Sequence, residues 1–389
     1  MDQRRLHELE EQCIQDCDPP CTSRCPVHVD VRQMCKEISA GDFKHALITF
    51  QKSVPFPEII ARTCDQPCQA LCNREPLGGA IRMADLELAC CQLGMEESLL
   101  SPVTGRKNAL VSVIGGGLCG MTAAWELARK GYRVVLFDQA EQLGGQLWGL
   151  TDAQLPKEVI LRESAKLKNK GIDLRLKTRV DLNAFDWAQY DAVLIATGVD
   201  QESVNWLEKN RQGNTVIDPV TFESGMSGVF CGGSLLHPPS TITSVADGKR
   251  TATSIDRYLQ KVSLTASRSS EGTQDTRLYT NLAGVLPVFA VPPADALQGY
   301  TMEEAIAEAS RCLVCECMEC VKVCTYLSEL GAYPRKYVRD IYNNLSIIMR
   351  QRRGNKFINS CTLCGLCGEV CPTDLNFAEV IVQARKTMV

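Results

Sequence analysis

The 21 cysteines of this 389-residue chain are concentrated near its two ends. Eight lie in residues 13–72 and nine in residues 312–371, and the other four are Cys90, Cys91, Cys119 and Cys231. The opening sequence MDQRRLHELEEQC lacks the apolar core of a signal peptide, and no stretch approaches the roughly 18 to 20 apolar residues of a membrane span. We therefore expect a cytoplasmic protein without a membrane span, whose reduced thiols bind metal instead of forming disulfides.

Composition excludes several classes of protein. Hydrophobic residues make up 45% of the chain, which is enough for two or three domain cores and excludes a disordered chain or a small disulfide scaffold. The 42 Lys and Arg residues are nearly balanced by 46 Asp and Glu residues, for a net charge of -4. Because this mild acidity gives no general attraction for nucleic acid or anionic lipid, we expect neither as a partner.

The cysteine pattern predicts metal-binding modules at residues 1–100 and 301–389, on either side of a central domain at residues 108–261. Residues 262–300 are first polar and then rich in proline, without sustained hydrophobic periodicity. This composition is typical of a linker between the central and C-terminal modules.

The C-terminal module contains the four-cysteine run of bacterial ferredoxins. Cys361, Cys364, Cys367 and Cys371 provide the spacing C-x2-C-x2-C-x3-C, and Pro372 follows. In such a run three thiolates bind three irons of one [4Fe-4S] cluster, and the fourth binds the other cluster. Two zinc knuckles are the alternative, but zinc sites seldom need four thiols in so tight a run followed by proline.

A second run supplies the partner ligands and has five cysteines where four are needed. It comprises Cys312, Cys315, Cys317, Cys320 and Cys324. The last three match the end of the ferredoxin spacing, whereas Val314 stands where the first cysteine is expected. Cys315 or Cys312 must take that place, and we favour Cys315. Crosswise pairing then predicts two clusters, one on Cys315, Cys317, Cys320 and Cys371, and one on Cys361, Cys364, Cys367 and Cys324.

The segment that joins the two runs, residues 334–351, has helical character and many positive charges. The charges on and after it are those of Arg335, Lys336, Arg339, Arg350, Arg352, Arg353 and Lys356. A solvated helix face is the ordinary explanation of such a pattern, and docking of an acidic partner is the less common one.

The central module begins with a dinucleotide-binding fingerprint. An apolar strand at residues 109–114 runs into Gly115-x-Gly117-x-x-Gly120, and a helix and a second strand that ends at Asp138 follow. The glycines let the backbone approach a pyrophosphate at the helix N-terminus, and the acid binds a ribose hydroxyl. This unit alone leaves NAD and FAD as alternatives.

Four later segments show a resemblance to a flavoprotein family, that of the glutamate synthase small subunit and the N-terminal half of dihydropyrimidine dehydrogenase. They are QLGGQL at 142–147, LPKEV at 155–159, YDAVLIATG at 190–198 and GVFCGGS at 228–234. Ser234 stands where the family has Asp. The resemblance implies an FAD site that includes Gly144, Gly145, Thr197, Gly198, Gly233, Ser234 and Thr241.

The chain departs from this family by an absence. In the family a second Rossmann unit, which binds NADPH, lies between the ATG strand and the GVF motif. Here only the 28 residues from Val199 to Met226 lie between them, and a βαβ unit needs about 30 or more. We infer that the pyridine-nucleotide domain is missing from this chain.

The same resemblance implies two [4Fe-4S] clusters in a helical N-terminal domain. The residues that show this resemblance are the FPEI segment at 56–59 and the three thiols that follow it. By position, one cluster takes Cys13, Cys17, Cys21 and Cys72, and the other takes Cys25, Cys64, Cys68 and Glu87. An ordinary solvated carboxylate is an equally good interpretation of Glu87. The remaining cysteines are interpreted as small apolar residues and are Cys35, Cys90, Cys91, Cys119, Cys231 and Cys312.

Together these motifs predict an α/β and α protein with a helical [4Fe-4S] domain, a Rossmann-type FAD domain and a two-cluster ferredoxin-like domain. Because flavin takes two electrons together and each cluster carries one, the expected function is electron transfer within a multisubunit, hetero-oligomeric oxidoreductase. Partners would be other oxidoreductase subunits or ferredoxin. The alternatives are a stand-alone flavin oxidoreductase that uses NAD(P)H or ferredoxin, and an iron–sulfur sensor or scaffold.

Overall fold

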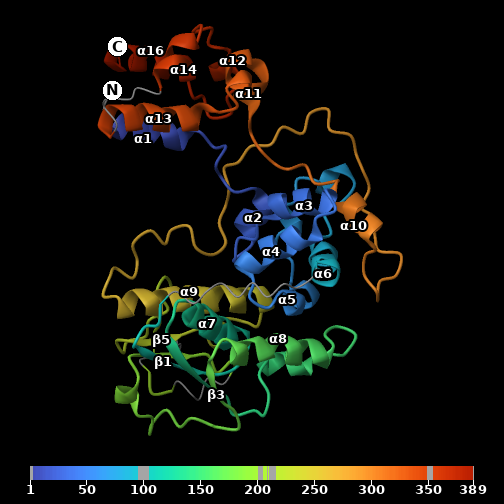
Figure 1. The fold of residues 1–389 in the computed structure, drawn as a ribbon, viewed down its shortest axis with the longest axis vertical. Helices are drawn as coiled ribbons and strands as arrows, with labels where there is room; N and C mark the ends of the chain where they lie inside the picture. Colours follow the sequence, from blue (N-terminus) through green and yellow to red (C-terminus); the bar gives the residue numbers. More distant parts are fainter. Residues whose placement is uncertain are drawn as a thin grey trace. The chain divides into compact units, whose positions relative to one another are not determined.

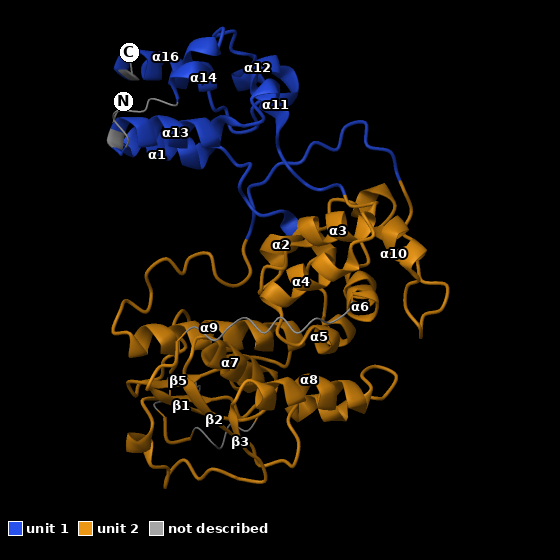
Figure 2. Ribbon diagram, viewed as in Figure 1, with its two compact units in different colours: residues 1–20, 275–287, 313–389 blue, residues 21–274, 288–312 orange. Residues whose placement is uncertain are grey.

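The structure is a computed structural model that describes residues 3–94, 105–199, 205–207, 209, 216–347 and 354–388. Its contacts divide the chain into two compact units, each built from segments that are far apart in sequence (Figure 2). Unit 1 contains residues 1–20, 275–287 and 313–389, and unit 2 contains residues 21–274 and 288–312. Residues 1–20, predicted as part of the N-terminal domain, group instead with the C-terminal module.

Unit 2 contains a five-stranded parallel sheet in the order β3-β2-β1-β4-β5. The strands are β1 (Leu110–Ile114), β2 (Arg133–Phe137), β3 (Asp173–Arg175), β4 (Ala192–Ile195) and β5 (Val229–Cys231). Apart from β3, they are almost wholly buried, which explains their continuous apolar sequences. The sequence expectation of a strand, glycine turn, helix and second strand at residues 109–138 matches this topology.

Each of the two faces of the sheet packs into a different hydrophobic core. Val113 faces a core formed with three long helices, which lie together beside the sheet in Figure 1. These helices are α7 (Leu118–Arg129), α8 (Lys157–Asn169) and α9 (Thr241–Leu259). On the other face, Ile114 and Val193 belong to a second core that aromatic rings such as Phe185 and Trp187 cover.

The rest of unit 2 is helical. Its helices are α2 (Pro20–Arg24), α3 (Val31–Ser39), α4 (Phe43–Ser53), α5 (Pro57–Thr63), α6 (Met83–Leu93) and α10 (Met302–Ala309). Short 3₁₀ turns in unit 2 are η1 (Gln69–Leu71), η2 (Glu75–Leu77), η3 (Gly145–Gly149), η4 (Trp187–Gln189) and η6 (Gly233–Leu235). Helices α3 and α4 are separate because Gly41 adopts a φ of 78° and Asp42 then caps α4 through the His45 N–H.

A buried ion pair fixes α10 to the helical part of unit 2. The side chains of Glu308 and Arg311 are 0% and 2% exposed, and they are 2.6 Å apart. Glu308 also accepts hydrogen bonds from the backbone N–H groups of Arg82 and Val291. Arg311 donates to the carbonyl oxygens of a turn whose residues are Gly78 and Gly79. Every charge is therefore partnered, as burial requires.

The regular structure of unit 1 within the described residues is entirely helical. Its helices are α1 (Gln3–Gln12), α11 (Glu319–Val323), α12 (Thr325–Glu329), α13 (Pro334–Ser346), α14 (Asn355–Ser360), α15 (Leu366–Glu369) and α16 (Phe377–Met388). Helix α1 lies against α13 (Figure 1). Its apolar residues Leu6 and Leu9 enter the same core as Val338 and Ile341. The N-terminal helix is therefore part of the core of the C-terminal module.

Part of the basic surface of residues 334–351 is neutralised within unit 1. Arg339 forms an ion pair with Glu10 at 2.5 Å, and Arg335 lies 3.3 Å from Asp16. Both carboxylates come from α1 or the loop after it. Two of the predicted docking charges thus hold the N-terminal helix, while Arg350, Arg352 and Arg353 lie outside the described residues.

The segment predicted as a linker, residues 262–300, has no helix or strand but is tied down by hydrogen bonds. In unit 2, Gln274 and Ser23 exchange two hydrogen bonds, and the Val288 N–H donates to the Leu77 carbonyl. In unit 1, Thr276 donates to the Asp18 carbonyl.

None of the helices in the described ranges is long and apolar enough to cross a membrane.

The buried pair in α10 generates a stability prediction. Glu308→Ala leaves the Arg311 guanidinium buried without a counter-charge, and we expect the free energy of unfolding to fall by about 3 to 5 kcal/mol. Glu303→Ala, on an exposed position of the same helix, is the matched control and should change it by less than about 0.5 kcal/mol. Urea denaturation of both variants measures the difference, and equal stabilities would contradict a structural role for the pair.

Candidate functional site

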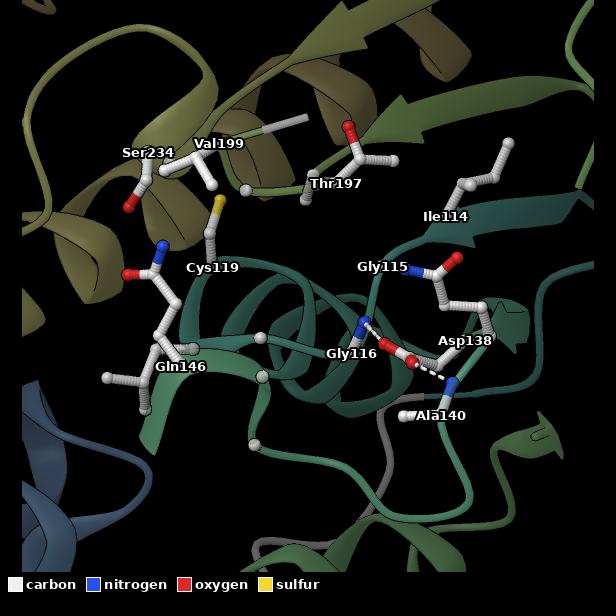
Figure 3. A pocket seen from close by; sticks show the side chains of 18 of the residues that line it. Ile114, Gly115, Gly116, Cys119, Asp138, Ala140, Gln146, Thr197, Val199 and Ser234 are labelled. Carbon is white, nitrogen blue, oxygen red and sulfur yellow. Dashed lines mark hydrogen bonds between the residues drawn. The ribbon is translucent and has the colours of Figure 1, made fainter. Parts of the chain in front are cut away.

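A cavity of about 930 Å³ opens at the carboxyl ends of β1, β2 and β4 in unit 2 (Figure 3). Ligands of open α/β sheets bind at this edge. Ten of the eleven residues predicted to bind the dinucleotide line the cavity. They are Gly115, Gly117, Asp138, Gly144, Gly145, Thr197, Gly198, Gly233, Ser234 and Thr241.

The glycines of the fingerprint have three different structural roles. Gly115 has a φ of 110°, and a Cβ there would lie 2.2 Å from the Ala196 carbonyl oxygen, so only glycine fits this turn. A Cβ at Gly120 would lie 1.9 Å from the Gly115 carbonyl oxygen, so Gly120 permits close packing of α7 and does not line the cavity. Gly117 is the N-cap of α7, and its missing Cβ would meet nothing within 4 Å. A phosphate can therefore approach the backbone at Gly117.

Asp138 lies at the end of β2, where a ribose-binding acid is expected. Its carboxylate accepts hydrogen bonds from the Gly116 N–H at 2.5 Å and the Ala140 N–H at 2.7 Å (Figure 3). These bonds fix the orientation of the side chain at the cavity wall. A carboxylate has about four acceptor sites, so the two N–H bonds leave acceptor capacity for a ribose hydroxyl.

Sequence reasoning missed several residues of the cavity. Arg179 and Asn183 line it from the loop after β3, and Gln146 lines it from η3. No motif marks the loop after β3, because that strand is only three residues long and is partly exposed.

A buried carboxylate behind the GVF motif was also missed. Asp247 on α9 accepts a hydrogen bond from the Gly233 N–H at 3.1 Å and lies 2.6 Å from His237 Nε2. The hydrogen bond to Asp247 raises the pKa of His237. Asp247 therefore holds the backbone of the cavity wall next to Ser234, where the related family has its own Asp.

Hydrogen bonds connect the cavity wall to the loop that carries Cys64. Ser240 and Thr241 line the cavity at the start of α9. The Thr241 hydroxyl donates to the carbonyl oxygen of Thr63 at 2.7 Å, and the Ser240 hydroxyl donates to Asp65 at 3.1 Å. These two partners flank Cys64. The loop that carries the Cys64 thiol is thus part of the same structural assembly as the cavity.

Four predicted ligands gather in the helical part of unit 2. They are Cys25, Cys64, Cys68 and Glu87. Glu87 on α6 is 7% exposed, which excludes the interpretation as a solvated carboxylate, and burial raises its pKa to about 8. Burial also raises the pKa of Cys64 and of Cys68, and the neighbouring Glu87 charge raises both further. This set of three soft thiols and one carboxylate has the donor chemistry of an iron–sulfur site with an oxygen ligand.

The other predicted N-terminal set is divided between the two units. Cys21 and Cys72 pack against the main core of unit 2, whereas Cys13 and Cys17 belong to unit 1. Cys35, which the sequence analysis treated as a small apolar residue, is 1% exposed, and its thiol is within hydrogen-bonding reach of the Cys312 thiol.

Unit 1 brings together one of the two predicted ferredoxin sets. Burial raises the pKa of Cys367, and the neighbouring charges of Cys324, Cys361 and Cys364 raise it further. The four thiols therefore lie near one another, as the crosswise pairing predicts. Of the other ferredoxin set, Cys317, Cys320 and Cys371 line a common small cavity, whereas Cys315 is absent from its lining.

Among the residues that the structure describes, no three His, Cys, Asp or Glu side chains are arranged to hold a single metal ion. A four-iron cube makes a different demand, because each ligand binds its own iron and the thiols need only surround a shared space. The groups around Glu87 and around Cys320 and Cys367 meet that demand in donor type and in grouping.

Family models match three segments of the chain. Residues 1–98 match the dihydropyrimidine dehydrogenase domain II 4Fe-4S cluster model, residues 113–156 match an NAD(P)-binding Rossmann-like domain, and residues 311–376 match a 4Fe-4S dicluster domain. These matches confirm the predicted fold class.

Curated relatives match about half of this chain. The beta subunit of NADP(+)-dependent formate dehydrogenase from Moorella thermoacetica is 33% identical over 47% of this chain and 30% of its own length. The glutamate synthase small chain of Bacillus subtilis is 29% identical, over 46% of this chain and 38% of its own. The beta subunit of NADPH-Fe(3+) oxidoreductase from Geobacter sulfurreducens is 25% identical, over 50% and 30%.

The chain thus spans about a third of the length of these relatives. The resemblance to the glutamate synthase small subunit and dihydropyrimidine dehydrogenase is confirmed. The chain is a homologue of the beta and small subunits of these oxidoreductases, and it joins a 4Fe-4S segment and a Rossmann-like domain to a C-terminal 4Fe-4S dicluster segment.

Proposed function

We propose that this protein is a flavin and iron–sulfur electron-transfer subunit of a multisubunit oxidoreductase. The observation that carries the proposal is the connection between cavity and thiols. The wall of the dinucleotide cavity, through Ser240 and Thr241, is hydrogen-bonded to the residues on both sides of Cys64. A flavin in this cavity and a cluster on the Cys64 group would therefore be held at a fixed separation by one rigid part of unit 2.

The residues of the cavity have separate tasks in holding FAD. The backbone at Gly117 and the start of α7 receive the pyrophosphate, and Asp138 binds the ribose. Arg179, which also lines the cavity, adds a positive charge for the phosphates. FAD takes up two electrons together and passes them on one at a time, and each [4Fe-4S] cluster accepts one. The chain's own contribution is to position these groups and to limit the access of water.

We propose four [4Fe-4S] clusters beside the flavin. Glu87 with three thiols of unit 2 would hold one cluster, and Cys367 with its three neighbouring thiols would hold another. Both ligand sets are supported by their grouping in the structure. The two remaining sets stay predictions from the sequence, and the fourth ligand of the Cys320 group is taken up below.

The electron donor or acceptor of the flavin is proposed to be a partner protein. Between β4 and β5 the described residues contain no further sheet strand, but they form isolated antiparallel bridges from Ile217 to Ser224 and from Glu223 to Phe230. The 28 residues from Val199 to Met226, between the ATG segment and the GVF motif, are fewer than the about 30 that a nucleotide-binding βαβ unit needs. Other oxidoreductase subunits or a ferredoxin, within a cytoplasmic hetero-oligomeric complex, are the partners that fit the proposed role.

A second candidate function is a stand-alone flavin oxidoreductase that reacts with NAD(P)H. The match of residues 113–156 to an NAD(P)-binding Rossmann-like domain favours it. Under this alternative the nicotinamide would meet the flavin directly at the mouth of the cavity.

Mixing anaerobic protein with NADH and NADPH in a stopped-flow instrument separates the two candidates. We expect flavin bleaching slower than about 1 s⁻¹ with either nucleotide, below the usual range of enzyme turnover. Dithionite serves as the control and should bleach the flavin fully. Rapid bleaching by either nucleotide would support the stand-alone enzyme and contradict the relay.

Flavin binding is tested at Gly117. Gly117→Val places a side chain, whose Cβ meets no protein atom within 4 Å, in the open space meant for the pyrophosphate, and we expect FAD affinity to fall about 100-fold, which corresponds to about 2.7 kcal/mol. Gly105→Val is the matched control, since a Cβ at Gly105 also meets nothing within 4 Å. Flavin absorbance and iron content are measured together. Unchanged flavin affinity in Gly117→Val would contradict the proposed site.

The role of Glu87 is tested by changing its donor atom. Glu87→Cys should keep about 16 irons per chain and lower the reduction potential of one cluster, because thiolate donates more electron density than carboxylate. Glu87→Ala should produce the paramagnetic signal of a three-iron cluster. Asp85→Ala on the same helix is the control. The ligand role fails if Glu87→Ala and Asp85→Ala give the same iron content and the same spectra as the unaltered protein.

A further inference from the structure

Cys13 follows α1 directly in sequence, but it lies inside the C-terminal module of unit 1. Its side chain is 9% exposed, and it belongs to the same core as Leu6 and Leu9. The ferredoxin thiols Cys320 and Cys371 pack against this core. The position of Cys13 is therefore set by the burial of the apolar face of α1 against α13, and not by the short-range cysteine spacing at residues 13–25.

Two hydrogen bonds fasten the chain around Cys13 to both ligand loops of the ferredoxin motif. The Gln12 side chain donates to the Thr373 carbonyl oxygen at 2.6 Å, two residues after Cys371. The Gln15 side-chain oxygen accepts from the Cys317 N–H at 2.8 Å. The residues on either side of Cys13 are thus tied to the two loops whose thiols must bind one cluster.

The thiols themselves surround one space. The small cavity between these loops is lined by Cys13, Cys317, Cys320 and Cys371, together with Cys367 of the neighbouring group. Cys13 therefore has the same three thiol neighbours that a fourth ligand of this cluster needs.

Cys315, the ligand favoured by sequence spacing, shares an apolar group with Cys317, Ile14 and Leu278, against which Cys17 packs. It does not line the cavity between the ligand loops. The preceding Val314, which stands at the ferredoxin position, has a φ of 48°, so the chain turns sharply before Cys315.

We infer that Cys13, supplied by the N-terminal segment of the chain, is the fourth ligand of the ferredoxin cluster on Cys317, Cys320 and Cys371. The inference rests on the proposed iron–sulfur content of the C-terminal module. It replaces the missing cysteine at position 314 with one about 300 residues away in sequence. It also removes Cys13 from the predicted N-terminal set, which keeps Cys17, Cys21 and Cys72. One cluster of the module is then closed by the N-terminal helix.

The test counts three-iron clusters by electron paramagnetic resonance in anaerobically purified, mildly oxidised protein. Cys13→Ala removes one ligand of a cube, and we expect a three-iron signal of about one spin per chain. Cys315→Ala is the matched control for this module. A misfolded variant would lose iron altogether, so the appearance of a three-iron signal distinguishes ligand loss from unfolding.

Two double variants identify the cluster to which Cys13 belongs. In Cys13→Ala with Cys320→Ala the same cube lacks two ligands, so the three-iron signal and about four irons should be lost. In Cys13→Ala with Cys72→Ala the signal of the Cys13 variant should persist. The inference is overturned if the three-iron signal persists in Cys13→Ala with Cys320→Ala but is lost in Cys13→Ala with Cys72→Ala. It is also overturned if Cys13→Ala alone gives no three-iron signal. Absence of iron from the unaltered protein would instead refute the proposed cofactor content.

Discussion

The structure depends on one requirement, that polar metal-binding groups from distant segments be gathered into buried spaces. The thiols proposed as cluster ligands must lie beside one another to share a metal centre, whereas Cys119 and Cys231 lie within apolar cores. In unit 2 the requirement is met by α5, α6 and the loop at Cys25, which bring three thiols around the Glu87 carboxylate. The buried pair of Glu308 and Arg311 holds the adjoining turn in place.

The flavin-type cavity follows from a different and more local constraint. A tight turn at Gly115 and close packing at Gly120 place the start of α7 beside the carboxyl end of β1. These two contacts are steric and are encoded within six residues. For that reason the local sequence was sufficient to predict the fingerprint and its two strands, with Gly115, Gly117 and Asp138 at the cavity. The other seven predicted residues that line the cavity came from the resemblance to the flavoprotein family.

Other parts of the structure could not be predicted from the local sequence. The apolar face of α1 predicts that the helix is buried, but nothing in its sequence says against which partner. The structure shows the partner to be α13, which moves Cys13 and Cys17 from the predicted N-terminal set to unit 1. Arg179 and Asn183 escaped notice because the loop that carries them follows a three-residue strand with no distinctive pattern.

The placement of α1 also affects how the protein is made. Residues 1–20 leave the ribosome before α13, which completes their core and is synthesised some 300 residues later. Until then the apolar face with Leu6 and Leu9 has no native partner and is exposed to the other nascent segments and to chaperones. Such long-range closure is slow because the intervening chain must first be ordered. Unit 1 is therefore expected to be the last part of the molecule to reach its native state.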